Sequence, residues 1–369
     1  MNWKNFPSPG PARSRSLSCA NSGLTASSKR WSNLLKEPLE VFPMNSKYKI
    51  YGGELSYFTR KLEAALIFYG ADFESLNKGE HNPQEIESRS GTHQVPVLQT
   101  PENWMIGDTT PLMQLLDTRF PARRMFPEGP LGVLVQIVEE YFDEWVARTM
   151  VHYRWHYAES AEFASLKMAN GNAEAAARVR NWGPRACRAT GTDSEVQRKA
   201  AEDEYGRILA AMESQLAETP YLLGERPTAV DCVMLGGLRA HTNMDPDPKK
   251  VTANYPRVVA WCETEADKWN GTGELVPFPN STAFAQFVLA EMATTYQPYV
   301  LGNREAQLAG AKAFHVEVYG EDVSYLSRPY PERSRQMIVD RIGNNLTTEE
   351  GGEVRGWLKS VKLAESFGI

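Results

Sequence analysis

The chain has little cysteine, no long apolar run and no excess of basic residues. Its four cysteines, Cys19, Cys187, Cys232 and Cys262, are widely spaced without a C-x-x-C pair, which argues against a disulfide framework, a zinc ribbon or a dithiol redox site. No stretch approaches the ~18 continuous apolar residues of a membrane-spanning helix. The formal net charge of −6 gives no general basic field for a phosphate backbone or an anionic membrane. We therefore expect a soluble, cytoplasmic protein without nucleic-acid or membrane partners.

Several motifs of common enzyme classes are also absent. The sequence contains no Walker loop, no dinucleotide glycine fingerprint, no serine-hydrolase elbow and no internal repeat. His152 and His156 lie one helical turn apart with Glu159 following, and such a set could coordinate a metal. There is no H-E-x-x-H motif and no cysteine partner beside them, so we expect no metal site.

The length of 369 residues is too great for one typical core and predicts two domains with an extension. Residues 1–45 are rich in Ser, Pro, Lys and Arg, with no acidic residue before Glu37, and we expect them to form a disordered or targeting segment. Their composition resembles an organelle transit peptide, which would place the protein in an organelle instead of the cytoplasm. A reading frame that truly starts at Met44 fits equally well.

Residues 46–122 alternate short apolar stretches with helical patterns, as in an α/β domain. Gly70 stops the first helical pattern, and Asn82 followed by Pro83 marks the start of the second helix. The expected elements are a strand at 48–51, a helix at 58–69, a weak strand near Phe73, a helix from 83, a hairpin of strands at 95–98 and 104–106, and a helix starting at Thr109 or Thr110. The predicted order is β-α-(β)-α-β-β-α.

The rest of the chain reads as mostly helical. Residues 130–280 are expected to form an all-α domain, with amphipathic runs near 133–158, 195–217 and 229–243. Thr228 and Asp231 have the spacing of a capping box. Residues 281–369 are expected to form a C-terminal extension made of a helix, a small hairpin and closing helices.

Four segments together resemble a known family. Leu55–Lys61, Gln94–Leu98, and Asp108-Thr109 followed by Leu115–Pro121 resemble successive signatures of the glutathione transferase N-terminal domain. Tyr221–Asp231 resembles the signature of its helical domain. The resemblance implies a thioredoxin-like α/β N-terminal domain followed by an all-α C-terminal domain, a homodimer, and glutathione as cosubstrate.

Ser56 is the candidate catalytic residue. It lies where a strand ends and a helix begins, so its hydroxyl and the free backbone N–H groups there can address one anion, for which a thiolate is the natural guest. The resemblance implies that Ser56 holds the catalytic position of this family. The serine could instead be a simple N-cap. Tyr57 stands where relatives often have proline, and Tyr51 or Tyr57 could offer a rival hydroxyl.

Two further segments are candidate glutathione-binding elements. At Val95-Pro96 the resemblance implies a cis peptide that presents the Val95 backbone to a peptide ligand, with Gln94 adding a side-chain contact. A proline in an edge strand would also explain this segment. Thr109 can cap the next helix while its N–H receives the γ-glutamyl carboxylate, and Asp108 would pair with the ammonium. A cluster of capping residues is the alternative interpretation.

A third candidate site concerns the second substrate. Helical spacing places several aromatic and basic residues close to one face, where they could form an electrophile pocket opposite Ser56. Packing between helices explains the aromatic residues equally well. The candidate pocket residues are Tyr141, Trp145, Arg148 and His152.

These features predict an enzyme that activates the thiol of glutathione for attack on a small hydrophobic electrophile. Lyase, dehalogenase or ether-cleaving reactions would use the same glutathione site. The alternative is a non-catalytic glutathione transferase-like scaffold that acts through protein interaction, since fold alone does not decide function.

Overall fold

The computed structural model describes residues 47–369, so the expected segment 1–45, with Cys19, lies outside the described residues. The described residues belong to one compact unit. A single cluster of buried hydrophobic side chains extends from Tyr48 in the first strand to Phe367 near the C-terminus. No helix among residues 47–369 is both long enough and apolar enough to cross a membrane. The expected domain boundaries stay predictions, because the regions they separate share this core.

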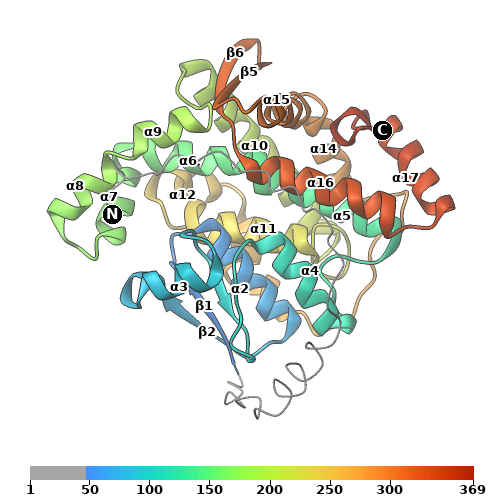
Figure 1. Ribbon diagram of the computed structural model, residues 1–369, viewed down its shortest axis with the longest axis horizontal. Coiled ribbons are helices and arrows are strands. Elements are labelled where there is room, and N and C mark those ends of the chain that lie inside the picture. Colours follow the sequence, from blue (N-terminus) through green and yellow to red (C-terminus); the bar gives the residue numbers. More distant parts are fainter. Residues whose placement is uncertain (1–46) are drawn as a thin grey trace, which may run out of the picture. The chain divides into compact units, whose positions relative to one another are not determined.

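A four-stranded mixed sheet forms the N-terminal part (Figure 1). Its strands are β1 (Tyr48–Gly52), β2 (Phe73–Asn77), β3 (Val97–Gln99) and β4 (Met105–Ile106), in the spatial order β2-β1-β3-β4. Strand β2 is parallel to β1, whereas β3 is antiparallel to β1 and β4 is antiparallel to β3. This topology confirms the expected α/β class, including the weak strand near Phe73.

Three helices connect or follow these strands: α2 (Tyr57–Tyr69), α3 (Pro83–Ser90) and α4 (Thr109–Arg119). Helix α2 begins after Ser56 and ends at Gly70, whose φ of 69° is a left-handed conformation that glycine adopts without a Cβ clash. Helix α3 begins after Asn82, whose side-chain oxygen accepts a hydrogen bond from the Glu85 N–H (3.4 Å). Local capping chemistry therefore sets the ends of these helices, as the sequence predicted.

Helix α2 packs against α11 (Ala229–Gly237) in the helical part of the chain, and Figure 1 shows the two side by side. A Cβ atom on Gly236 would lie 2.7 Å from the Tyr57 carbonyl oxygen, so this close approach requires glycine. The predicted capping box of Thr228 and Asp231 is present at the start of α11. These contacts fix the helix that carries Ser56 at its N-terminus.

The chain from residue 129 to residue 268 is mostly helical, which confirms the expected fold class. The long predicted runs fall on α5 to α6, on α10, and on α11 with the π-helical segment that follows it. The elements are α5 (Gly129–Glu140), the π-helical η3 (Tyr141–Val146), α6 (Ala147–His156), α7 (Ala158–Met168), α8 (Ala173–Arg180), α9 (Gly183–Ala189), α10 (Glu195–Glu218), η4 (Leu238–Thr242), α12 (Pro246–Thr252), α13 (Pro256–Ala260), η5 (Trp261–Glu265) and η6 (Ala266–Lys268).

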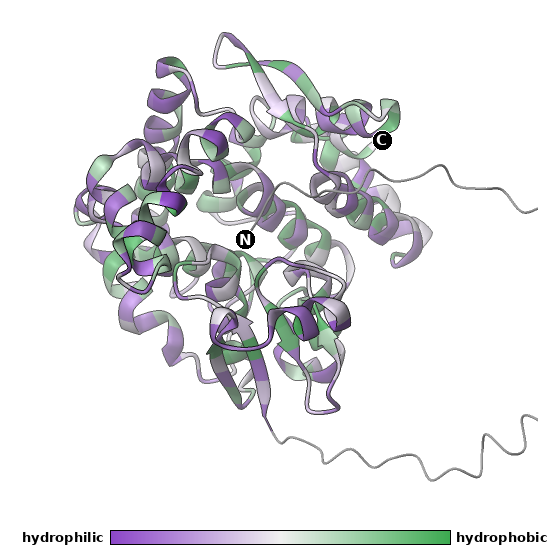
Figure 2. Ribbon diagram, turned by 60° about the vertical axis from the view of Figure 1, so that its left-hand side comes forward, coloured by the Kyte–Doolittle hydropathy of each residue, from purple (hydrophilic) through white to green (hydrophobic). Residues whose placement is uncertain are grey.

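The C-terminal region contains the predicted helix, hairpin and closing helices, with one further helix, α15, before the hairpin. Its elements are α14 (Ala283–Met292), α15 (Tyr296–Ala309), β5 (Ala313–Val318), β6 (Glu321–Leu326), α16 (Pro329–Asn344) and α17 (Thr348–Ser360). Helix α16 packs against α5 and α15. Figure 2 shows hydrophobic and hydrophilic residues interspersed along most helices and along the strands. The C-terminal region therefore contributes side chains to the common core.

Candidate functional site

A cavity of about 390 Å³ lies at the N-terminal ends of α2 and α4. The structure brings all five predicted catalytic and glutathione-binding residues to its wall: Ser56, Gln94, Val95, Asp108 and Thr109. They come from three separate segments of the N-terminal part. The predicted residues therefore form one site, although they span more than fifty positions in the sequence.

Ser56 occupies the N-cap position of α2 and is half-buried. Its Oγ accepts a hydrogen bond from the Thr59 N–H (N to Oγ 3.3 Å). Capping uses a lone pair of the Ser56 oxygen and leaves the O–H proton available. Among residues 47–369 that proton is donated to no hydrogen-bond acceptor. The two interpretations of the serine, as a helix cap and as a donor to a ligand in the cavity, are therefore compatible.

The two rival tyrosine hydroxyls lie away from this cavity. The Tyr57 hydroxyl is buried and donates to the Phe142 carbonyl oxygen (3.1 Å). Burial and the nearby charge of Asp143 raise the pKa of Tyr57 well above its ordinary value. The Tyr51 hydroxyl donates to Gln99 Oε1 (2.9 Å). Neither tyrosine lines the cavity, so Ser56 is favoured over both.

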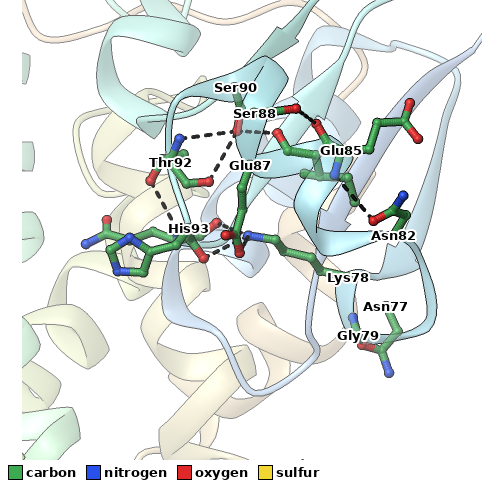
Figure 3. A network of polar contacts seen from close by, with 12 residues as sticks. Asn77, Lys78, Gly79, Asn82, Glu85, Glu87, Ser88, Ser90, Thr92 and His93 are labelled. Atoms are coloured by element: carbon green, nitrogen blue, oxygen red, sulfur yellow. Dashed lines mark hydrogen bonds and ion pairs between the residues drawn. The ribbon is translucent and has the colours of Figure 1, made fainter. Parts of the chain in front are cut away.

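The loop that carries Gln94 and Val95 is held from behind by Lys78, a residue that the sequence did not single out (Figure 3). Lys78 is buried, and its Nζ donates to the carbonyl oxygens of His93 (2.8 Å) and Gln94 (3.1 Å). It also pairs with Glu87 Oε1 (3.4 Å). A buried cation that holds two successive carbonyls restricts the path of the loop.

Val95 offers an open stretch of backbone to the cavity. The Val95–Pro96 peptide is cis, as the resemblance implied. Within the described part of the chain, neither the N–H nor the C=O of Val95 has a hydrogen-bond partner, and the pairing of β3 with β1 begins two residues later at Val97. A half-buried peptide group without a partner is suited to pair with the backbone of a ligand.

The N-terminus of α4 also faces the cavity, and one prediction about it was wrong. Thr109 is the first residue of α4, whereas Asp108 takes the N-cap position, with a positive φ of 68° and no capping hydrogen bond. Across residues 47–369 the backbone N–H groups of Thr109 and Thr110 have no partner, and Pro111 has none to offer. The Asp108 side chain is instead turned toward Arg333 (Nη1 to Oδ2 3.2 Å). The helix end thus presents unpaired donors and a positive partial charge to an anion.

Two segments of the chain match models of one protein family. Residues 50–124 match the family "Glutathione S-transferase, N-terminal domain", and residues 174–266 match "Glutathione S-transferase, C-terminal domain". These two segments belong to the glutathione transferase superfamily. Both matched segments end before residue 281, so the C-terminal extension that reaches the cavity lies outside them.

Solved glutathione transferases resemble the chain at low identity. One from Rhodospirillum rubrum F11 is 14% identical with a TM-score of 0.42, covering 65% of this chain and 99% of that one. Another, from Methylobacterium radiotolerans in complex with glutathione sulfonate, is 17% identical with a TM-score of 0.39, covering 64% and 98%. The beta-etherase LigF from Sphingobium sp. strain SYK-6 is 14% identical with a TM-score of 0.44, covering 61% and 96%. No curated protein matches the chain.

In this glutathione transferase-like protein the extension contributes to the cavity wall. Its residues there come from the residue before α16 and from about the first half of that helix: Arg328, Tyr330, Arg333, Ser334 and Met337. Sequence reasoning missed all of them, because a turn followed by an ordinary helix start gives no local sign of what it will face.

A buried charged cluster lies beneath the cavity. The Lys61 Nζ, which is fully buried, forms ion pairs with Glu139 and with Asp143 Oδ1 (2.5 Å), and it donates to Thr110 Oγ1 (2.9 Å). Asp143 also lines the cavity. Burial raises the pKa of Glu139 to about 7, even though the charge of Lys61 opposes the shift. This cluster connects α2, α4, α5 and η3 under the site.

Glu144 lines the cavity beside Asp143, and its Oε2 accepts a hydrogen bond from Arg328 Nη2 (3.1 Å). Burial raises the pKa of Glu144 to about 8, with the charges of Asp143 and Asp108 adding to the shift and that of Arg328 opposing it. At neutral pH this carboxyl is therefore largely protonated and neutral.

Glu144→Gln is expected to flatten the pH dependence of stability. A raised folded-state pKa means that the native state keeps a proton that the unfolded chain has released, so the wild-type protein loses stability as the pH rises toward 8. The variant has no proton to lose, so it should match the wild type near or below pH ~4.5, gain on it by about 1.4 kcal/mol per pH unit above that, and level off above pH ~8. Urea unfolding across this range measures the difference, and parallel curves for the two proteins would contradict the assignment.

The expected electrophile residues lie elsewhere. Tyr141, Trp145 and Arg148 are buried, and all three donate hydrogen bonds to the Glu204 carboxylate, at 2.6 to 2.8 Å. His152 is buried and contacts Glu202 Oε1 (2.8 Å). None of the four lines the cavity, because their polar atoms contact Glu204 or, for His152, Glu202, both in α10. Packing explains this face, and the described residues contain no cluster arranged to hold a metal ion.

Proposed function

We propose that the protein is a glutathione-dependent transferase that uses the cavity at Ser56. What supports this proposal is that three kinds of unpaired hydrogen-bonding group open onto one cavity: the Ser56 hydroxyl, the Val95 backbone and the Thr109 N–H. A γ-glutamyl tripeptide needs a partner of each kind.

In this proposal each part of glutathione has its own partner. The cysteinyl backbone pairs with the N–H and C=O of Val95, as an added strand would. The γ-glutamyl carboxylate lies at the N-terminus of α4, and Asp108 takes the ammonium. The thiol then reaches Ser56, whose hydroxyl donates a hydrogen bond to the thiolate and lowers the pKa of that thiol.

The reaction follows from an ionised thiol. The proton leaves the sulfur to solvent, the thiolate forms a bond to an electrophilic carbon, and the leaving group departs with the electron pair of the broken bond. Phe58, Tyr330 and Met337 give the cavity apolar wall, which suits a small hydrophobic electrophile. Lyase, dehalogenase and ether-cleaving reactions share the first half of this sequence.

Three measurements test the proposal. Isothermal titration calorimetry with glutathione reports binding, and absorbance at the thiolate band against pH reports whether the bound thiol has a lowered pKa. A conjugation assay with an activated aryl halide then reports turnover. Absence of binding would refute the proposal. Binding with an unshifted thiol pKa and no turnover would favour the non-catalytic scaffold.

A further inference from the structure

The ion pair between Arg333 and Asp108 joins the C-terminal extension to the proposed glutathione site. The pair connects residues 225 positions apart, with an Nη1 to Oδ2 distance of 3.2 Å. Arg333 lies in α16, outside both segments that match the family, so the family match says nothing about its role. Both residues line the cavity.

Most N–H donors of the Arg333 guanidinium make no hydrogen bond within the described residues. Among the described residues it donates one hydrogen bond, the one to Asp108, out of the five N–H groups that a guanidinium carries. Its side chain is 57% exposed, and its Cζ lies 5.1 Å from the centre of the Tyr330 ring. The face of the Tyr330 ring holds the guanidinium in the cavity wall. The edge of the guanidinium stays open to a second anion.

Arg328, the other arginine of the cavity wall, is differently placed. Its Nη2 donates to both Glu144 Oε2 (3.1 Å) and the Tyr299 hydroxyl (2.8 Å). These contacts fix its guanidinium against η3 and α15. Arg333 is therefore the better candidate for a ligand contact.

The charges around Asp108 match those of an amino-acid zwitterion. Asp108 offers a negative charge, and Arg333 beside it offers a positive charge. The unpaired N–H groups of Thr109 and Thr110 add hydrogen-bond donors. The pKa of Asp108 is raised by burial and by the charge of Asp143, so its carboxylate gains from a second cation. A ligand with a single charge would break the ion pair and bind only one of its two residues, whereas a zwitterion can bind Arg333 and Asp108 together.

We propose that Arg333 binds the α-carboxylate of the γ-glutamyl group, so that the zwitterion of glutathione inserts between Arg333 and Asp108. This inference rests on the proposed function. It makes the C-terminal extension of the same chain part of the glutathione site and gives that extension a role in recognising the ligand.

Truncated ligands test which ligand group Arg333 contacts. Glutathione, glutaryl-Cys-Gly without the α-ammonium and 4-aminobutyryl-Cys-Gly without the α-carboxylate are titrated calorimetrically into wild type, Arg333→Ala and Arg333→Lys. Arg333→Ala should weaken binding of glutathione and of glutaryl-Cys-Gly about tenfold. It should bind 4-aminobutyryl-Cys-Gly at least as tightly as the wild type does, because Asp108 is then free for the ammonium. Arg333→Lys keeps the charge and should lose about threefold or less.

Arg304→Ala is the matched control, because Arg304 lies in α15, pairs with its neighbour Glu305 and does not line the cavity. It removes the same charge and should bind all three ligands as the wild type does. Equal losses for all three ligands in Arg333→Ala, or no loss for glutathione, would overturn the inference while leaving the proposed function intact. If the wild type binds no glutathione, the proposed function fails and this inference fails with it.

Discussion

Replacing Ser56 by alanine should raise the pKa of the thiol of bound glutathione by roughly 1–2 units, the equivalent of losing about 1.5–3 kcal/mol. The proton of the Ser56 hydroxyl is not already committed to a partner within the described residues. A helix N-terminus alone supplies only about 0.3–1 kcal/mol, too little to replace a charge-assisted hydrogen bond. Turnover at neutral pH should fall about 10–100-fold.

Binding of glutathione should largely survive in Ser56→Ala, because the Val95 backbone and the N-terminus of α4 are untouched. Tyr51→Phe and Tyr57→Phe are the matched controls, since both hydroxyls lie off the cavity and bond to Gln99 and Phe142. Thiolate absorbance against pH, followed in all three variants, gives the result. A shift in a tyrosine variant with none in Ser56→Ala would transfer the role to that tyrosine.

Lys61→Met should destabilise the protein by about 3–5 kcal/mol. The lysine is fully buried and pairs with two carboxylates, Glu139 and Asp143, while it also donates to Thr110. Its removal leaves two adjacent buried negative charges without a cation. The loss should be smaller at low pH, because Glu139, whose pKa is already raised to about 7, then takes up a proton and removes one of those charges.

Chemical unfolding at about pH 5 and about pH 8 measures this loss and its pH dependence. The triple variant Lys61→Met, Glu139→Gln, Asp143→Asn is the control, because it removes the uncompensated charges together with the cation. It should recover most of the lost stability. A loss below about 1 kcal/mol in the single variant at pH ~8 would mean that the cluster is solvated rather than buried.

The sequence predicted those parts of the site that depend on local chemistry. Ser56 is a cap whose bonds reach three residues along the chain, and Gly70 is the left-handed end of the same helix. The family resemblance singled out Val95 and Asp108, whereas the strand predicted to begin at Val95 begins at Val97. A further local error was the capping role of Thr109: that residue is already inside α4, and the N-cap position falls on Asp108, whose side chain pairs with Arg333 and does not cap the helix.

The sequence could not assign the face that Tyr141, Trp145 and Arg148 share. Spacing of three and four residues shows which side chains lie together, but it does not show what that face packs against. In the fold, Glu204 of α10 gathers these three donors, and the opposite side of the same segment presents Asp143 and Glu144 to the cavity.

By itself the sequence determined the α/β and all-α parts and the order of their elements, and its resemblance to a known family indicated five of the residues that line the cavity. The elements follow from hydrophobic periodicity, capping and turn chemistry, which act over a few residues. Tertiary structure alone decided that α16 closes the cavity with Arg333 and that Lys61 supports it from below. Contacts such as Arg333 with Asp108 join residues that no local rule connects, because long-range charge pairing is set by how the helices pack.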